Sequence, residues 1–72
     1  MLLITGITGL TGRFLITALR EAGYSGNIRC LIREHSDISW ITDENIEFVK
    51  GDVTDVKSLI TACQGVEGVI HL

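Results

Sequence analysis

The stretch TGITGLTG, residues 5–12, decides the fold of this chain. Its glycines, Gly6, Gly9 and Gly12, have the spacing G-x-x-G-x-x-G. They follow an apolar run at residues 1–5, which predicts a strand buried on both faces, and they open a helical pattern at residues 11–22. Gly6 permits a tight turn out of the strand, Gly9 lets the backbone approach a ligand without an intervening Cβ, and Gly12 lets the helix pack closely on the sheet.

The start of this predicted helix favours an anionic ligand, because the unpaired N–H groups of its first turn and the positive end of its dipole attract phosphate. A nucleoside-triphosphate loop is disfavoured, since that motif requires lysine after its last glycine and Gly12 is followed by Arg13 and Phe14. Three glycines also serve as a plain connection between a strand and a helix. Thr8 and Thr11 fit equally well as phosphate ligands and as local caps.

Hydrophobic periodicity predicts the remaining elements. Strands are expected at residues 27–33, 46–50 and 68–72, and a short helix at residues 37–41 with Ser36 or Asp37 as its cap. A longer helix is expected after Thr54 and Asp55 and ends at Gly65. This alternation predicts an α/β fold with a parallel sheet, right-handed crossovers and no internal domain boundary.

The apolar residues of the two longer helices indicate which faces should be buried. In the first helix only Ile16 lies outside the predicted arc, and in the second the arc runs at i, i+3, i+4 and i+7. The arcs are Phe14, Leu15, Ala18, Leu19 and Ala22 in the first helix, and Val56, Leu59, Ile60 and Cys63 in the second.

Composition excludes several classes of function. Of the 72 residues, 46% are hydrophobic and 21% are charged, with a net charge of −3, so a globular core is expected and nucleic acid is a poor partner. No apolar run approaches the roughly 20 residues that span a bilayer, so we expect a cytoplasmic protein without a membrane segment. Cys30 and Cys63 have no C-x-x-C spacing, which argues against a zinc site or a redox dithiol, and both are expected to be core thiols.

Four motifs in order resemble the short-chain dehydrogenase/reductase superfamily, in its extended and atypical members, the NAD(P)-dependent epimerase/dehydratase-like and NmrA-like proteins. TGITGLTGRFL resembles their cofactor loop, IRCLIRE their second strand, FVKGDVTD the segment after their third strand and GVIHL the start of their fourth. The resemblance implies a Rossmann-like sheet of strand order 3-2-1-4. It also implies that residues 1–72 form the N-terminal NAD(P)-binding portion of a domain that is larger in the family.

The same resemblance implies roles for residues of the cofactor site. Leu10 and Thr11 would offer backbone amides to the pyrophosphate, Asp52 would bond the adenine amino group, and Val53 would lie against the adenine ring. Gly51 and Asp52 also fit a plain turn that ends a strand. Of the two histidines, His71 is expected to pack near the cofactor floor and His35 to be a solvated loop residue.

The end of the second predicted strand indicates which dinucleotide is bound. NAD-specific domains usually place a carboxylate about 20 residues beyond the glycine motif, whereas Arg33 lies 21 residues after Gly12. A guanidinium there favours the 2′-phosphate of NADP(H), with Arg13 approaching from the helix. A shift of one residue would point Glu34 at the ribose instead and favour NAD(H), and both arginines also fit a solvated surface.

The catalytic pair of the family, Tyr-x-x-x-Lys, is absent from these 72 residues. Tyr24 is followed four residues later by Ile28, and no tyrosine precedes either lysine at that spacing. The sequence therefore predicts the cofactor-binding portion of an NAD(P)-dependent oxidoreductase or epimerase/dehydratase-like protein. A non-catalytic NADP(H)-sensing module of the NmrA-like kind and a Rossmann-like fragment without a ligand are the alternatives. We also expect self-association through the fourth strand, whose outer edge would be unpaired.

Overall fold

The computed structural model contains four strands and two helices, and it describes residues 1–72 apart from the side chain of Leu10. In chain order the elements are β1 (Leu2–Thr5), α1 (Leu10–Glu21), β2 (Ile28–Ile32), β3 (Ile46–Lys50), α2 (Val56–Cys63) and β4 (Gly68–His71). The strands form one sheet in the order β3-β2-β1-β4, and every neighbouring pair is parallel. The predicted Rossmann-like strand order is confirmed.

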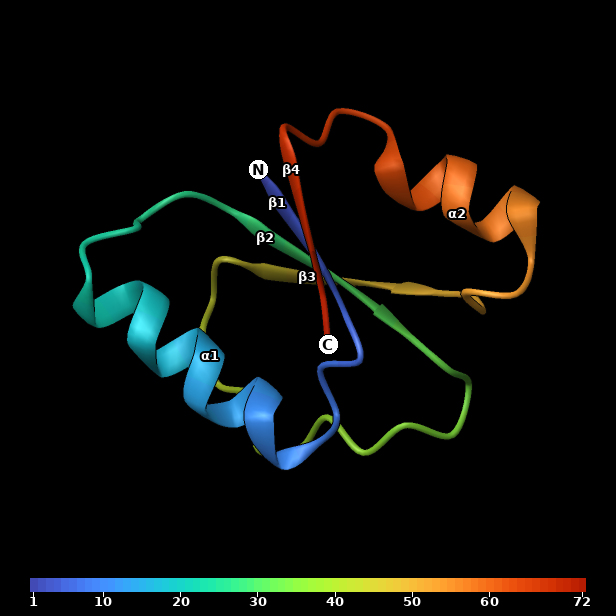
Figure 1. Cartoon of the computed structure of the whole chain (residues 1–72). Helices are drawn as coiled ribbons and strands as arrows, with labels where there is room; N and C mark the ends of the chain where they lie inside the picture. Colours follow the sequence, from blue (N-terminus) through green and yellow to red (C-terminus); the bar gives the residue numbers. More distant parts are fainter.

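The two helices lie on opposite sides of the sheet (Figure 1). The crossover through α1 leads outward from β1 to β2, whereas the crossover through α2 leads back from β3 to β4 on the far side of β1. Because both crossovers are right-handed, reversing the direction of travel places the second helix on the other face. The parallel strands all finish at one edge, where Thr5 is level with Leu31 and His71.

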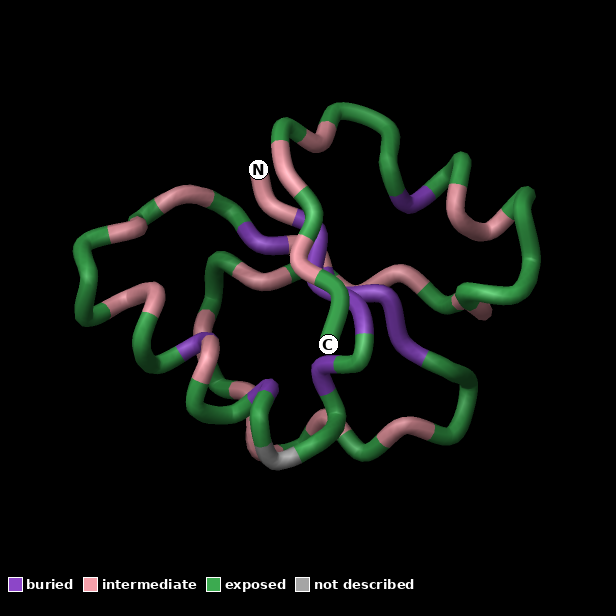
Figure 2. Tube along the Cα trace, in the orientation of Figure 1, coloured by how far each residue is buried: buried purple, intermediate pink, exposed green. Residues whose placement is uncertain are grey.

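Alternate residues of each strand supply two separate cores. Ile4, Ile28 and Cys30 are fully buried on the face covered by α1, and Leu3 and Leu31 are buried on the face covered by α2. Figure 2 shows that the buried residues lie mainly along the central strands. Burial raises the pKa of the Cys30 thiol to about 11, so this cysteine is the inert core thiol that the sequence predicts.

Helix α1 buries its predicted face only in part: Leu15 and Leu19 pack against the α1-side core as predicted, but other positions differ. Ile16, the residue expected to lie outside the apolar arc, is buried, whereas Phe14 is 68% exposed and Ala18 is exposed. The tight contact between Gly12 and the loop at Ile7 explains the difference. It turns Gly12 inward, and Ile16 follows one turn later on the same face.

Helix α2 also departs from its predicted apolar face. Leu59 packs on the sheet and Ala62 is fully buried, but Val56 and Ile60 are at least 60% exposed. Cys63 is exposed, so the prediction that it is a core thiol is wrong. The periodicity defines an arc wider than the strip of helix that reaches the sheet, and the small Ala62 makes the closest approach.

The short helix predicted at residues 37–41 does not form. Ser36 accepts a hydrogen bond from the Arg33 amide at 3.0 Å, and Asp37 accepts one from the Ser39 amide at 3.0 Å. These side chains satisfy local amides in turns rather than capping a helix, which is the usual competition between short polar side chains and helical hydrogen bonds. Trp40 still packs against the α1-side core.

Strand β4 forms one edge of the sheet, next to β1. Val69 is 54% exposed on the face shared with α2. The self-association expected through this edge stays a prediction. None of the helices in the described part of the chain is both long and apolar enough to cross a bilayer.

Candidate functional site

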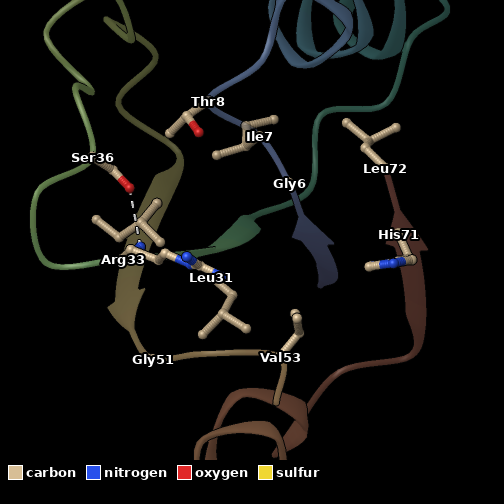
Figure 3. Close-up of a pocket in the computed structure, with 11 residues that line it drawn as sticks. Gly6, Ile7, Thr8, Leu31, Arg33, Ser36, Gly51, Val53, His71 and Leu72 are labelled. Atoms are coloured by element: carbon tan, nitrogen blue, oxygen red, sulfur yellow. Dashed lines mark hydrogen bonds between the residues drawn. The ribbon is translucent and has the colours of Figure 1, made fainter. Parts of the chain in front are cut away.

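A cavity of about 220 Å³ lies outside the carboxyl ends of the strands, where residues of β2 and β4 meet the segments that follow β1 and β3 (Figure 3). This is the place at which open parallel sheets bind ligands, next to the point where the strand order reverses between β1 and β4. In the close-up Arg33 and Ser36 lie on one side, His71 and Leu72 on the other, and Val53 below them. The lining residues are Gly6, Ile7, Thr8, Leu31, Ile32, Arg33, Ser36, Gly51, Val53, His71 and Leu72.

Each glycine of the quoted motif meets a different constraint. Gly6 has φ +77°, and a Cβ there would lie 2.8 Å from the carbonyl oxygen of Leu72. A Cβ on Gly12 would overlap the carbonyl group of Ile7, so Gly12 allows the helix to pack on the loop after β1 rather than on a strand as predicted. A Cβ on Gly9 would have only the Gly6 oxygen near it, at 3.9 Å. Space is therefore open beside Gly9.

The first turn of α1 is open to an anion. Gly9 is the N-cap residue and offers no side chain to the helix amides, and the first turn has no acidic residue within the described part. In α2, by contrast, the Asp55 side chain accepts a hydrogen bond from the Lys57 amide, so the predicted cap lies at Asp55 rather than at Thr54. An uncapped helix start with a positive dipole end favours a phosphate group.

The threonines of the motif differ in position. Thr8 lines the cavity, whereas Thr11 is exposed in the first turn of α1 and does not line it. Leu10 is the first residue of α1, and its side chain lies outside the described part of the structure. The predicted contacts of these residues with a pyrophosphate stay predictions.

Arg33 borders the cavity, and Glu34 does not. Arg33 is the first residue after β2, and its guanidinium is 3.8 Å from Asp52 Oδ1. Glu34 lies instead in the adjoining shallow cavity, together with Lys50 and Asp52. The register that would turn Glu34 toward the main cavity is therefore not the observed one.

Asp52 lies in the turn that follows β3. Its Oδ1 accepts hydrogen bonds from the amide and the hydroxyl of Thr54, both at 2.9 Å. These bonds, and to a lesser extent the charge of Arg33, lower the pKa of Asp52 below its ordinary value of 3.8. The side chain is a carboxylate at neutral pH. Asp52 borders the adjoining cavity, whereas its neighbour Val53 lines the main one.

Arg13 lies away from the cavity. Its guanidinium sits over the ring of Trp40, 5.1 Å from the ring centroid. Together with Trp40 it lines a different cavity, between α1 and the segment that joins β2 to β3.

Two side chains at the cavity were not predicted as ligands. Ser36, considered in the sequence only as a helix cap, lines the cavity because the turn that begins at Arg33 brings it back. In the sequence, the only indication that Ser36 belongs to the site was its position three residues after Arg33. His71 lines the cavity as expected for the cofactor floor, and its Nδ1 is hydrogen-bonded to the Thr5 hydroxyl. Within the described residues no cluster of side chains has the composition of a metal site.

Acid is expected to destabilise this fold through its aspartates. Hydrogen bonds from Ser39 to Asp37, from Arg20 to Asp43 and from Thr54 to Asp52 lower the pKa of each aspartate below 3.8. Their stabilisation is fully present above the unfolded-state pKa and is lost as the pH falls through the lower folded-state values. Urea titrations should give a free energy of unfolding that declines below about pH 4.

The variant Asp43→Asn is the matched control for this pH dependence, because it removes one of the three carboxylates. It should be less stable than the wild type at neutral pH and show a shallower acid decline. An unfolding free energy that stays level through the acid range in the wild type would contradict the prediction.

The family profile described as "NAD dependent epimerase/dehydratase family" matches residues 2–72. The chain belongs to this family. The match covers the glycine loop, the end of β2, the turn after β3 and β4, which are the elements that surround the cavity.

Within the epimerase/dehydratase family the chain is similar to proteins of different activities. It is 36% identical over 69 residues to sterol demethylase protein B of Methylococcus capsulatus, and 33% identical over 75 residues to vestitone reductase of Medicago sativa. These alignments cover 96% and 94% of this chain but 20% and 23% of the relatives. The chain thus spans about a fifth of the length of the curated relatives that it matches.

Solved structures of the family share the fold. The crystal structure of a variant of uronate dehydrogenase from Agrobacterium tumefaciens, complexed with NAD, superposes with a TM-score of 0.76 at 27% identity. The match covers 99% of this chain and 25% of that one. Vestitone reductase superposes with a TM-score of 0.77 at 31% identity, over 97% of this chain and 24% of that one.

Proposed function

We propose that residues 1–72 bind a nicotinamide dinucleotide, as the cofactor-binding portion of an oxidoreductase or an epimerase/dehydratase-like protein. One observation carries the proposal: a glycine loop with open space at Gly9 leads from the carboxyl end of β1 into an uncapped helix at the point where the strand order reverses. Family membership and the NAD complex of the related uronate dehydrogenase support the same ligand.

The residues around the cavity fit such a cofactor. The open space at Gly9 and the free helix start suit a pyrophosphate, and the apolar Leu31 and Val53 suit an adenine ring. Asp52 is ionised and close by, as a hydrogen-bond acceptor for an exocyclic amino group. When bound, the cofactor supplies hydride transfer, and these residues bind and orient its adenosine and pyrophosphate parts.

These 72 residues contain no Tyr-x-x-x-Lys pair. We therefore propose that any reaction centre of the natural protein is supplied by residues other than these 72. A Tyr-x-x-x-Lys pair in the natural protein supports an enzyme, and a protein that binds the cofactor without one supports the NmrA-like sensor. A cytoplasmic location belongs to this proposal, and the free thiols of Cys30 and Cys63 are consistent with a reducing compartment.

Calorimetric titration of the whole natural protein with NADPH and with NADH tests the proposed function. We expect saturable binding of at least one dinucleotide with one site per chain. Titration with ATP and with AMP provides the control, because a site built for a dinucleotide should bind both mononucleotides more weakly. Heat signals at the level of buffer dilution for both dinucleotides would overturn the proposal.

We further propose that NADP(H) is preferred over NAD(H), because Arg33 borders the cavity and Glu34 does not. A charge-assisted hydrogen bond contributes roughly 1.5–3 kcal/mol, which corresponds to about a tenfold to hundredfold change in affinity. Arg33→Ala should therefore weaken NADPH binding by about that factor and leave NADH binding nearly unchanged. Calorimetry with both cofactors measures the two effects.

Lys50→Ala is the matched control for Arg33→Ala. Lys50 ends the neighbouring strand, is exposed and lines only the adjoining cavity, so its removal changes the net charge equally without removing the proposed ligand. It should change NADPH affinity by less than about threefold, as expected for an exposed charge that water and salt screen. Equal losses for the two cofactors in Arg33→Ala, or a wild-type preference for NADH, would show that the NADP(H) assignment is wrong.

A further inference from the structure

The segment that joins β2 to β3, residues 33–45, is fastened to α1 at two points. Arg13 lies over the ring of Trp40, and Arg20 forms an ion pair with Asp43 at 2.6 Å. The two arginines are seven residues apart, which places them on one face of the helix two turns from each other. We call residues 33–45 the strap, because they run back along α1 before entering β3 (Figure 1).

The ion pair of Arg20 with Asp43, which we call the far fastening, is supported by further hydrogen bonds. The Arg20 guanidinium also donates hydrogen bonds of 2.8 Å to the carbonyl oxygens of Tyr24 and Gly26, so it ties the end of α1 to the chain that leads into β2. Its partner Asp43 additionally accepts a hydrogen bond from the Asn45 amide. This end of the strap lies away from the cavity at the carboxyl ends of the strands, since Arg20 is in the last turn of α1 whereas the glycine loop leads into its first turn.

The contact of Arg13 with Trp40, which we call the near fastening, connects the segments that form two walls of the proposed cofactor site. Arg13 directly follows Gly12, the last glycine of the loop, and Trp40 lies four residues after Ser36, which lines the cavity with Arg33. The charge of Arg13 also contributes to the low pKa of Asp37, after the hydrogen bonds from Ser39. The contact therefore connects the glycine loop to the wall formed by Arg33 and Ser36.

Apolar packing holds part of the strap between its two fastenings, because Ile38, Trp40 and Ile41 pack against the α1-side core. A cavity of about 410 Å³ separates α1 from the strap there, with Ile16 and Thr17 on the helix side and Ile41 and Thr42 on the strap side. Trp40 is half-buried. Beside this opening, the cation–π contact of Arg13 with Trp40 adds to the apolar packing and contributes roughly 0.5–2 kcal/mol.

We propose that the Arg13–Trp40 contact positions the dinucleotide site by setting the separation between the glycine loop and the wall formed by Arg33 and Ser36. The inference rests on the proposed function and adds a positioning role to it. It also reassigns Arg13, which acts through Trp40 and not as a direct ligand of a 2′-phosphate. Because the glycine loop faces the pyrophosphate, which both cofactors contain, loss of the contact weakens the binding of NADH as well as that of NADPH.

Affinity measurements on single and double variants of the whole natural protein test this role. Trp40→Ala and Arg13→Ala should each weaken the binding of both cofactors, and the loss for NADH should be about threefold to tenfold. The double variant should bind within about twofold of either single variant, because both substitutions remove one contact. Trp40→Phe keeps an aromatic ring over the guanidinium and should restore most of the affinity.

The far fastening supplies the control. Asp43→Asn should lower the midpoint of urea unfolding yet change the affinity for either cofactor by less than about twofold, because it releases the strap away from the site. A loss confined to NADPH in Arg13→Ala would overturn the positioning role and make Arg13 a phosphate ligand. Unchanged affinity in Trp40→Ala, with normal binding by the wild type, would also overturn it while leaving the proposed function intact.

If Trp40→Ala fails to fold, Trp40→Leu and Arg13→Gln remove the cation–π contact while keeping side-chain bulk, and the same fold-changes are expected. Absence of dinucleotide binding by the unsubstituted protein would instead overturn the proposed function, and the positioning role with it. The two failures are therefore distinguishable from one set of titrations.

Discussion

Gly12→Val is expected to prevent this domain from folding. A Cβ at Gly12 would overlap the carbonyl oxygen, the carbonyl carbon and the Cα of Ile7, which are all backbone atoms. Neither partner has room to retreat, because Ile7 is 1% exposed within the α1-side core and Gly12 is held in α1. Overpacking usually costs about 1–3 kcal/mol, and a clash with fixed backbone falls at or above the upper end.

The measurement for Gly12→Val is near-ultraviolet circular dichroism with urea unfolding, in the whole natural protein. A loss of about 3 kcal/mol or more removes much of the stability of a typical domain, which is about 5–15 kcal/mol. We therefore expect little native signal and a low soluble yield. Gly12→Ala adds the same Cβ and should act in the same direction to a smaller extent. A native spectrum with an unchanged midpoint in Gly12→Val would mean that the helix does not rest on the loop in this way.

Gly9→Val is expected to leave the domain folded and abolish dinucleotide binding. Gly9 has φ −78° and ψ 173°, an extended conformation that valine adopts readily. A Cβ there would meet only the Gly6 oxygen, at an ordinary contact distance of 3.9 Å. The valine methyl groups would therefore enter the open space in which, under the proposed function, the pyrophosphate approaches the backbone.

The expected loss for Gly9→Val exceeds about a hundredfold for NADPH and NADH alike, because hydrogen bonds to a charged group contribute about 1.5–3 kcal/mol each and at least two amides would lose the pyrophosphate. Calorimetry measures the affinities, and urea unfolding should show a midpoint close to that of the wild type. Gly9→Ala, with a single methyl group, should give an intermediate loss. Retained affinity in a folded Gly9→Val protein would mean that the glycine motif only connects β1 to α1 and does not bind the cofactor.

The α/β class and the edge of the sheet that holds the cavity could be predicted from local patterns in the sequence, and the resemblance to the family implied the strand order. Short apolar runs that alternate with helical periodicity leave few topologies once crossovers are right-handed. The glycine spacing then identifies the turn that joins the first strand to the first helix. Arg33 was likewise within reach of prediction, because counting from Gly12 locates the end of the second strand.

The buried faces of the helices could be predicted only in part, because helix rotation depends on contacts that are remote in sequence or specific in shape. Periodicity placed Phe14 inside the apolar arc and Ile16 outside it, yet the contact of Gly12 with Ile7 turns Ile16 inward and leaves Phe14 exposed. Cys63 is exposed for a related reason, since only a narrow strip of α2 reaches the sheet. The turns at residues 37–41 formed because Ser36 and Asp37 bind nearby amides.

The two arginines beside the site separate what sequence and tertiary structure each determined. The sequence by itself placed Arg13 after the glycine loop and Arg33 after the second strand, because these positions follow from spacing along the chain. Only the fold decided that Arg33 borders the cavity while Arg13 lies over Trp40. The physical reason is that side-chain direction depends on which segment packs alongside, and the pairing of β2 with β3 is what brings the strap next to α1.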